Sequence, residues 1–303
     1  MTIELVTAPW VRAIARPVID PDALMAFALE HGLKDLIDED NDTPLDRIWR
    51  NVAGYDEHET DADILSEFAG RFCYRSWDKG RSTADYLGNV IAERHGNVLA
   101  HTNVSFIVTG VSRALTHELI RHHVGTNPSQ ESQRYVTAEG GEIEVIGFKA
   151  MRAVVPPLIL KWARDKEIAK GLNPEHFMLG PDISVFRADF EAALSKYDWW
   201  LKDLKAGLPA DMSKTLKKKR ANEAARCFLP NACETRLVWT MNMRAARNVI
   251  EQRGDEHADL EIRRLAVAFT HELKEIAPRT FADAEVYTAA DGFEAVRVAH
   301  SKV

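Results

Sequence analysis

Hydrophobic and polar residues alternate along the segment Val98–Thr109, which reads VLAHTNVSFIVT. Successive side chains of a strand point to opposite sides, so this segment predicts a strand with one apolar and one polar face. The apolar face would consist of Val104, Phe106 and Val108, and the polar face of His101, Asn103 and Ser105. We therefore expect a half-buried strand in this part of the chain.

Apolar residues at helical spacing predict several helices. Ser112 is a suitable N-cap for a helix that runs through Ile120, and Gly125 and Pro128 would bring it to an end. The segment Asp259–Ile276 predicts an amphipathic helix whose apolar stripe contains Ile262, Leu265, Phe269, Leu273 and Ile276. The other predicted elements are strands at Trp10–Pro17 and Thr235–Thr240 and helices at Pro21–Leu33 and Arg244–Arg253.

We expect a single domain that spans residues 1–303 and carries two insertions. Residues 38–63 are acidic, contain Pro44 and Gly54, and indicate an insertion at the surface. Residues 153–219 have a mainly helical pattern, broken by a loop at Gly171–Asp182, and form the second insertion. The basic run Lys217–Arg220 at its end is most simply a solvated helix face.

Composition and charge limit the function classes. The chain has 303 residues, 46% of them hydrophobic, and a net charge of -7, so it has material for a full core and as a whole repels polyanions such as nucleic acids. No apolar run approaches the roughly 20 residues that a membrane span needs. Neither a secretory signal nor CxxC spacing is present, and Cys73, Cys227 and Cys233 indicate reduced thiols. We expect a cytoplasmic protein that binds neither membrane nor nucleic acid.

Reactive side chains are densest in His117–Arg134, HELIRHHVGTNPSQESQR. Its start resembles a zinc motif, but zinc-binding histidines on one helix lie four residues apart, whereas His117 and His122 lie five apart. We therefore expect no metal site. The spacing instead places Glu118, Arg121 and His122 on one helix face. An ordinary ion-paired helix end would have the same pattern.

The residues that follow suit an anionic ligand. Gln130–Tyr135 is rich in hydroxyl, amide and guanidinium groups, which can bind phosphate. A second group of arginines, interleaved with asparagines, consists of Arg226, Arg236, Arg244, Arg247 and Arg253. Arg244 and Asn248 lie one turn apart on a predicted helix. These segments favour a site for a heterocyclic anion such as a nucleotide, with a network of surface ion pairs as the equal alternative.

Four stretches of the chain resemble the flavin-dependent thymidylate synthases. They are VLAH at Val98–His101, GVSRALTHELIRHH at Gly110–His123, SQRY at Ser132–Tyr135, and ARCFLPNACETRLVWTMNMRAARNVIEQR at Ala225–Arg253. The run EHADLEIRRLA at Glu256–Ala266 continues the likeness, which covers most of the chain outside the two insertions.

The resemblance implies a fold, an activity and an assembly. The fold would be α+β, with helices packed around a central, mainly antiparallel or mixed sheet, and the protein a homotetramer with active sites shared between subunits. The activity would be the conversion of dUMP to dTMP. The one-carbon donor would be methylenetetrahydrofolate, and FAD reduced by NADPH would supply the hydride. Because that reaction needs no thiolate, the three cysteines are expected to be small buried side chains.

The resemblance also implies roles for individual residues. Arg253 would be the catalytic residue that stabilises the ionised uracil and so activates its C5 atom. The residues implied to bind dUMP are Glu118, Leu119, Ile120, Arg121, Gln130, Glu131, Ser132, Gln133, Arg134, Arg226 and Arg253. Those implied to bind FAD or folate are His101, Asn103, Arg121, His122, His123, Gln130, Asn242, Met243, Arg244 and Asn248.

The sequence departs from the family signature at two points. The signature has Arg-His-Arg, seven residues and then Ser, whereas here His123 takes the third place and eight residues, Val124–Glu131, precede Ser132. The extra residue, together with Pro128, would make the substrate loop bulge. Glu131 would be unfavourable beside a phosphate unless it faces solvent or an arginine. The altered loop leaves two alternatives open: a related hydroxymethylase of pyrimidine deoxynucleotides, and an inactive nucleotide-binding relative.

Overall fold

The computed structural model describes residues 3–37, 42–55, 59–78, 80–136 and 152–303. The chain divides into two compact units. The first consists of Met1–Trp10, Val108–Arg121 and Ser129–Leu237, and the second of Val11–Ile107, His122–Pro128 and Val238–Val303. The single-domain organisation therefore stays a prediction. Within the described ranges, no helix has the length and apolar character needed to cross a membrane.

A four-stranded sheet has the strand order β2-β3-β6-β4, and each of its strands contributes residues to both units. The strands are β2 (Trp10–Ala15), β3 (Asn103–Ser112), β4 (Thr126–Gln130) and β6 (Glu234–Asn242). Val104, Phe106 and Val108 of β3 are buried, which confirms the predicted alternation. The prediction that this strand begins at Val98 was wrong, because Gly96–His101 forms a short 3₁₀ helix, η2. Val98 and Leu99 are adjacent apolar residues rather than alternating ones, and Leu99 is fully buried.

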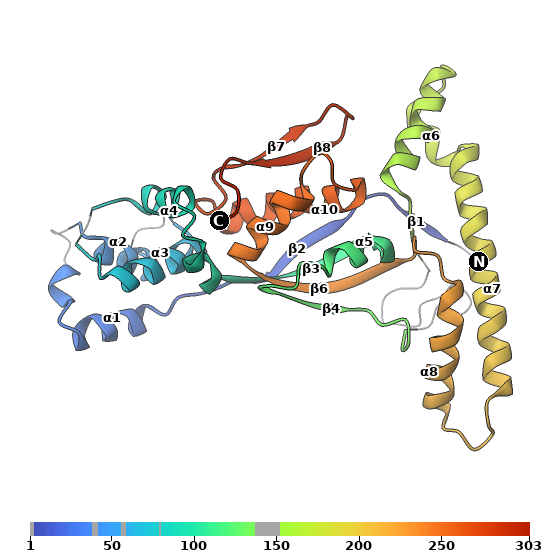
Figure 1. The fold of residues 1–303 in the computed structure, drawn as a ribbon, viewed down its shortest axis with the longest axis horizontal. Helices are drawn as coiled ribbons and strands as arrows, with labels where there is room; N and C mark the ends of the chain where they lie inside the picture. Colours follow the sequence, from blue (N-terminus) through green and yellow to red (C-terminus); the bar gives the residue numbers. More distant parts are fainter. Residues whose placement is uncertain (1–2, 38–41, 56–58, 79, 137–151) are drawn as a thin grey trace. The chain divides into compact units, whose positions relative to one another are not determined.

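The first unit contains a pair of helices that lie side by side (Figure 1), α7 (Pro181–Gly207) and α8 (Lys214–Ala225). Phe190, Leu194, Tyr197 and Leu201 repeat at intervals of three and four, so α7 has one continuous apolar stripe. This stripe packs on Ala221 and Ala225 of α8, in a cluster that also contains Ile3, Ala153 and Cys233. The other elements of this unit are β1 (Glu4–Val6), α5 (Arg113–Leu119), β5 (Arg152–Val154), α6 (Pro157–Ala169), η4 (Pro174–Leu179) and η5 (Arg226–Phe228).

Residues 153–219 are thus mainly helical, as expected. Their first residues instead belong to β5, which pairs in parallel with β1 so that Ala153 lies opposite Leu5. The predicted loop at Gly171–Asp182 contains η4 and ends where Pro181 begins α7. Proline suits this first helical position because its missing N–H has no partner there in any case.

The second unit is built around α10 (Leu260–Ile276). Asp259 caps this helix, its side chain accepting a hydrogen bond of 2.9 Å from Glu261 N, and the five residues of the predicted stripe are all buried. Figure 1 shows the antiparallel hairpin of β7 (Ala284–Thr288) and β8 (Glu294–Val298) beside α10 and α9 (Met243–Arg253). The remaining elements are α1 (Pro21–Glu30), η1 (Lys34–Leu36), α2 (Pro44–Val52), α3 (Asp61–Tyr74) and α4 (Thr83–Ala92).

The expected surface location of residues 38–63 was wrong for their central part, and their being an insertion stays a prediction. Residues 44–52 form α2, and its Leu45 and Ile48 have 0% and 1% exposure. The acidic composition concealed an amphipathic helix, because Asp46 occupies its first turn, where a carboxylate is favourable, and Thr43 caps it. Residues 38–41 and 56–58 lie outside the described part.

Replacement of Phe269 tests how much of the second unit's stability depends on α10. Phe269 is fully buried and meets Phe106 edge to face at 5.2 Å between ring centroids. We expect Phe269→Ala to lower the free energy of unfolding by about 3–5 kcal/mol. Urea denaturation would measure the change. Val185→Ala, at a helical position with 60% exposure, is the matched control and should cost under about 0.5 kcal/mol. Equal effects of the two substitutions would contradict the assigned core.

Candidate active site

Helix α5 positions the first group of predicted residues, in the first unit. Ser112 Oγ accepts a hydrogen bond of 3.1 Å from Leu115 N, which confirms the predicted N-cap. The helix ends at Leu119, and Arg121 N donates to Glu118 O at 3.2 Å in a turn. The prediction that Glu118, Arg121 and His122 share one helix face was therefore wrong. The chain leaves the helix six residues before Gly125, the residue expected to stop it.

Gln130 is the last residue of β4 rather than part of a loop. Its Nε2 donates hydrogen bonds of 3.1 Å to Thr116 Oγ1 and to Thr235 Oγ1. Two hydroxyls from α5 and β6 thus fix the amide, which sets where the chain turns out of the strand.

Glu131, the residue that departs from the family pattern, is held by two arginines of the first unit. Its N donates to Arg236 O at 3.0 Å, its carboxylate lies 3.3 Å from Arg236 Nη1, and its carbonyl accepts from Arg113 Nη1 at 3.1 Å. Arg236 is 9% exposed in its side chain and also pairs with Glu234 at 2.7 Å. The negative charge of Glu131 therefore faces an arginine, which was the condition for tolerating it.

The turn after Glu131 carries the predicted phosphate-binding residues. Tyr135 N and Val136 N both donate to Ser132 O, at 3.0 and 2.9 Å, and Arg134 N lies 3.3 Å from Ser132 Oγ. The Arg134 guanidinium binds Glu223 of α8, with Nε 2.7 Å from its carboxylate, and lowers the pKa of that carboxyl. Arg134 is thus oriented by an acidic partner of its own unit.

Arg113 is a cation near this turn that sequence reasoning did not include. Burial, and then the like charge of Arg226, lower the pKa of Arg113. Burial is the larger cause of this shift, and the like charge of Arg226 adds to it, so an anion bound close to both cations would be stabilised. The sequence signal for Arg113 was its position directly after the N-cap Ser112 and one helical turn before His117.

In the second unit, His101 and Asn103 flank a buried residue, Thr102. Thr102 Oγ1 donates to Ala62 O at 3.0 Å and lies 3.0 Å from Ser66 Oγ, while its carbonyl accepts from Met243 N at 3.0 Å. His101 and Asn103 are exposed on either side. Fixing Thr102 in the interior therefore presents both predicted ligand-binding side chains outward.

The start of α9 carries four more predicted residues. Asn242 caps the helix by accepting from Ala245 N at 2.8 Å, and the side chain of Met243 is fully buried. Arg244 and Asn248 are both exposed, as expected for residues one turn apart on one face. Arg244 Nε also donates to Val303 O at 3.3 Å.

His122 and Arg253 meet in the second unit. Arg253 Nε lies 2.8 Å from His122 Nε2, and His122 is 9% exposed while its neighbour His123 is exposed. The residue implied to be catalytic is thus hydrogen bonded to the central histidine of the signature.

The expectation that all three cysteines are buried was wrong for Cys73 and Cys227, which are exposed. Cys233 is buried between β5 and the α7–α8 pair, and burial raises its pKa to about 12. A thiol of that pKa is protonated at neutral pH and is a poor nucleophile.

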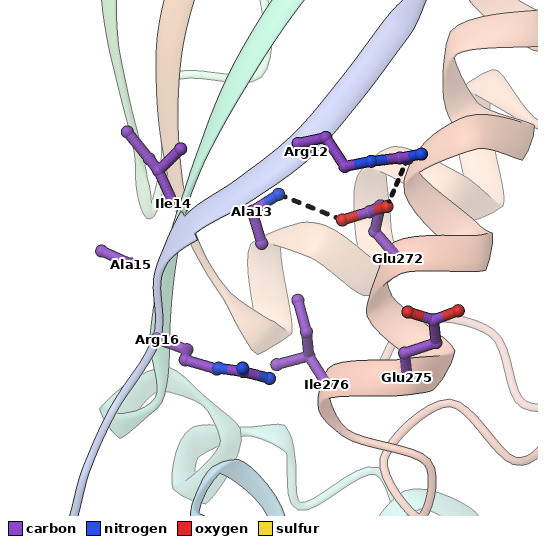
Figure 2. A pocket seen from close by; sticks show the side chains of 8 residues that line it. All are labelled: Arg12, Ala13, Ile14, Ala15, Arg16, Glu272, Glu275 and Ile276. Atoms are coloured by element: carbon purple, nitrogen blue, oxygen red, sulfur yellow. Dashed lines mark hydrogen bonds and ion pairs between the residues drawn. The ribbon is translucent and has the colours of Figure 1, made fainter.

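A hollow of about 640 Å³ lies elsewhere in the second unit, and none of the residues implied to bind dUMP, FAD or folate lines it. Figure 2 shows Glu272 of α10 facing β2, where its carboxylate accepts from Ala13 N at 3.0 Å and from Arg12 Nη1 at 2.8 Å. Because β2 is an edge strand, its outward N–H groups need partners, and Glu272 satisfies one of them.

The predicted residues therefore divide by unit. The dUMP set, except Arg253, belongs to the first unit, and the flavin set, except Arg121 and Gln130, belongs to the second. Arginine, histidine and amide side chains thus lie on strand ends and helix termini of an α+β fold, and these are the groups with which an enzyme can bind an anionic heterocyclic ligand.

Comparisons with known proteins give the family. Residues 57–279 match the family model described as thymidylate synthase complementing protein. The chain is 45% identical over 247 residues to the flavin-dependent thymidylate synthase of Mycobacterium sp. (strain JLS), covering 78% of this chain and 86% of that one. It is 42% identical over 243 residues to the enzyme of the same name from Mycobacterium tuberculosis (strain ATCC 25177 / H37Ra), with the same coverage. The chain belongs to the flavin-dependent thymidylate synthase family and is an enzyme of that family.

A solved structure supports the fold. The UMP/dUMP methylase PolB from Streptomyces cacaoi, bound with 5-Br UMP, is similar with a TM-score of 0.56 at 17% identity, covering 93% of this chain and 96% of that one. At this identity the likeness concerns the fold alone, and it confirms the α+β class.

Two substitutions of Glu131 test whether its charge is needed beside Arg236. Glu131→Gln keeps an oxygen that can accept a hydrogen bond, so it should lower the free energy of unfolding by less than about 1 kcal/mol. Glu131→Lys places a cation next to a buried guanidinium and should cost clearly more. Urea denaturation of both variants is the measurement, and indistinguishable midpoints would show that Glu131 does not pair with Arg236.

Thiol labelling tests the assignment of the cysteines. In native protein at pH 8 we expect rapid reaction of Cys73 and Cys227 with a thiol reagent and protection of Cys233, because its sulfur is buried and its pKa is about 12. Denatured protein should give three reactive thiols, and peptide mapping identifies the sites. Rapid labelling of Cys233 in the folded protein would contradict the structure.

Proposed function

We propose that this enzyme converts dUMP to dTMP, with methylenetetrahydrofolate as the one-carbon donor and NADPH-reduced FAD as the source of hydride. The proposal is carried by one observation. Within a chain that is 45% identical over most of its length to a flavin-dependent thymidylate synthase, Arg253 stands at the end of α9 with its Nε held by His122. PolB, the UMP/dUMP methylase that shares this fold, has 5-Br UMP bound in its structure, and a pyrimidine nucleotide as substrate agrees with that.

The first unit supplies groups suited to the phosphate of dUMP. Ser132 and Gln133 lie in a turn whose backbone is fixed by the bonds to Ser132 O, and Arg134 is oriented by Glu223. Arg113 and Arg226 add two cations, and burial together with the like charge of Arg226 lowers the pKa of Arg113. A phosphate bound near them would be stabilised by charge-assisted hydrogen bonds. Of the other residues implied to bind dUMP in this unit, Ile120 and Arg121 are exposed, whereas the side chain of Leu119 is fully buried.

The donor set of the second unit fits a flavin. His101, Asn103, His123, Arg244 and Asn248 are exposed and polar, and such side chains can donate to the pyrophosphate and to the ring oxygens and nitrogens. The buried side chain of Met243 leaves its neighbours, rather than itself, to make those contacts. When bound, FAD would supply the hydride, and these residues would bind and orient it.

Arg253 activates the substrate by charge. Uracil C5 is a weak nucleophile, and a guanidinium that favours negative charge on N3 and O2 raises the electron density at C5. No covalent enzyme adduct is needed for this, which agrees with the high pKa of Cys233. The exposed Cys73 and Cys227 have no assigned part in the reaction.

The assembly and location follow from the same proposal. The proposed assembly is the homotetramer with active sites shared between subunits that the family resemblance implies. Three free cysteines fit a reducing cytoplasm. The altered signature loop favours one second candidate, a hydroxymethylase in which water replaces hydride at the last step. Glu131 and the extra residue are the features that motivate it.

Product mass tests the proposal. The enzyme is incubated with dUMP, methylenetetrahydrofolate, FAD and NADPH, and the masses of the nucleotide products are measured by mass spectrometry. We expect dTMP, because hydride is available from reduced flavin. Hydroxymethyl-dUMP as the sole product would establish the second candidate instead. A colourless protein that cannot be reconstituted with FAD and forms no product would indicate an inactive relative.

Arg253→Ala tests the catalytic residue. We expect bound flavin close to the wild-type amount, since the implied flavin contacts lie elsewhere on α9, and a loss of dUMP turnover of about 100-fold or more, typical for removal of an electrostatic stabiliser. Flavin absorbance and dTMP formation are the two measurements. Unchanged turnover would show that Arg253 does not activate the substrate.

A further inference from the structure

The hydrogen bond between Arg253 and His122 has a direction that chemistry determines. A guanidinium offers only N–H donors and stays protonated, so Arg253 Nε must donate and His122 Nε2 must accept across their 2.8 Å separation. An imidazole nitrogen accepts only when it carries no proton. While this bond exists, the His122 ring is therefore neutral, with its proton on Nδ1.

Both partners are positioned by one helix. Gly125 O accepts from Asn242 N, the residue before α9, at 3.0 Å, and the carbonyl of His122 accepts from the hydroxyl of Thr126. Gly125 has a φ of +71°, and a Cβ there would lie 2.5 Å from Asn242 Nδ2. The turn that carries His122 is thus seated at the start of α9, and Arg253 is the last residue of that helix. The segment that contains His122 therefore contacts α9 at both ends, through Asn242 at its start and Arg253 at its end.

The atom that Arg253 uses has a consequence for its other nitrogens. Nε is the guanidinium nitrogen closest to the main chain, so a bond from Nε fixes the plane of the group and the direction of the Nη1 and Nη2 fork. Recognition of two neighbouring acceptors, such as N3 and O2 of an ionised uracil, depends on that plane.

We propose that His122 is a positioning residue for Arg253. Its unprotonated Nε2 sets the plane of the guanidinium so that the terminal nitrogens meet the uracil ring of dUMP. This rests on the proposed function, and it adds to the flavin contact implied by the family resemblance a separate role that acts through Arg253. It also gives a physical reason why a histidine, rather than a permanent cation, stands at position 122: an arginine or lysine there would offer no acceptor.

The first experiment separates the acceptor from the ring. His122→Gln places an amide oxygen near the position of Nε2, whereas His122→Phe keeps a ring of similar size without an acceptor. His257→Phe, at a side chain that is 87% exposed, is the matched control. In flavin-saturated holoenzyme we measure bound FAD, the dissociation constant of dUMP from its effect on flavin absorbance, and kcat and KM.

We expect His122→Phe to weaken dUMP binding or turnover by up to about 100-fold, the cost of misplacing a group by about 1 Å. His122→Gln should recover most of the loss, and His257→Phe should match the wild type. Should His122→Phe fold poorly, His122→Asn replaces it, because its shorter side chain also removes the acceptor from Arg253. Equal losses in the Gln and Phe variants at equal flavin content would overturn the proposal.

The second experiment tests whether His122 acts through Arg253. In an Arg253→Ala background, His122→Phe should have no further effect on dUMP affinity, because the partner that it positions is gone. An effect as large as in the wild-type background would overturn the proposal. A wild-type holoenzyme that binds dUMP but forms no dTMP would count against the proposed function instead, and the dUMP affinities of the variants would still decide the role of His122.

Discussion

The start of α9 is the point on which the second unit depends. Asn242 there accepts from Ala245 N and donates to Gly125 O, while Met243 N donates to Thr102 O. Three chain segments far apart in the sequence thus meet at one helix N-terminus, where unpaired N–H groups would otherwise need partners. The close approach of Gly125 leaves no room for a side chain. Because this junction places His101, Asn103 and His122, any ligand site built from them is only as well ordered as the junction itself.

The arginines separate into two groups with different tasks. Arg247, 2% exposed, pairs with Asp283 and donates to the carbonyls of Thr280 and His300. Arg236 pairs with Glu131 and Glu234. These pairs are internal, so breaking one would leave a buried charge without compensation. Arg226 and Arg244 are exposed instead. The net charge of -7 says little about either group, because affinity for a phosphate depends on charges within a few ångströms.

Sequence periodicity predicted the elements in which buried side chains recur at the spacing of a helix or a strand. The stripe of α10, the alternation of β3 from Asn103 onward and the cap at Ser112 follow from local rules, and the structure confirms them. Local rules failed where a distant partner decides the conformation. The helix at Arg113 ends early, and His122 turns back through the bond from Thr126 to meet Arg253, which is 131 positions away. The acidic composition of residues 38–63 concealed α2, because an average over the segment does not show the spacing of its few buried apolar residues.

Distant partners also determine the conformation of Val124–Glu131, the segment that is one residue longer than in the family signature. One extra residue before Ser132 was expected to make a bulge, but Thr126–Gln130 extends as β4 at the edge of the sheet. An edge strand can contain Pro128, because an N–H that faces outward is not needed for pairing. Gln130 is then fixed by two hydroxyls and Glu131 by Arg236 and Arg113 before the Ser132–Arg134 turn begins. Side chains of α5 and β6 thus hold both residues that precede this turn. The change in spacing is therefore compatible with the proposed nucleotide site and does not by itself argue for loss of the proposed activity.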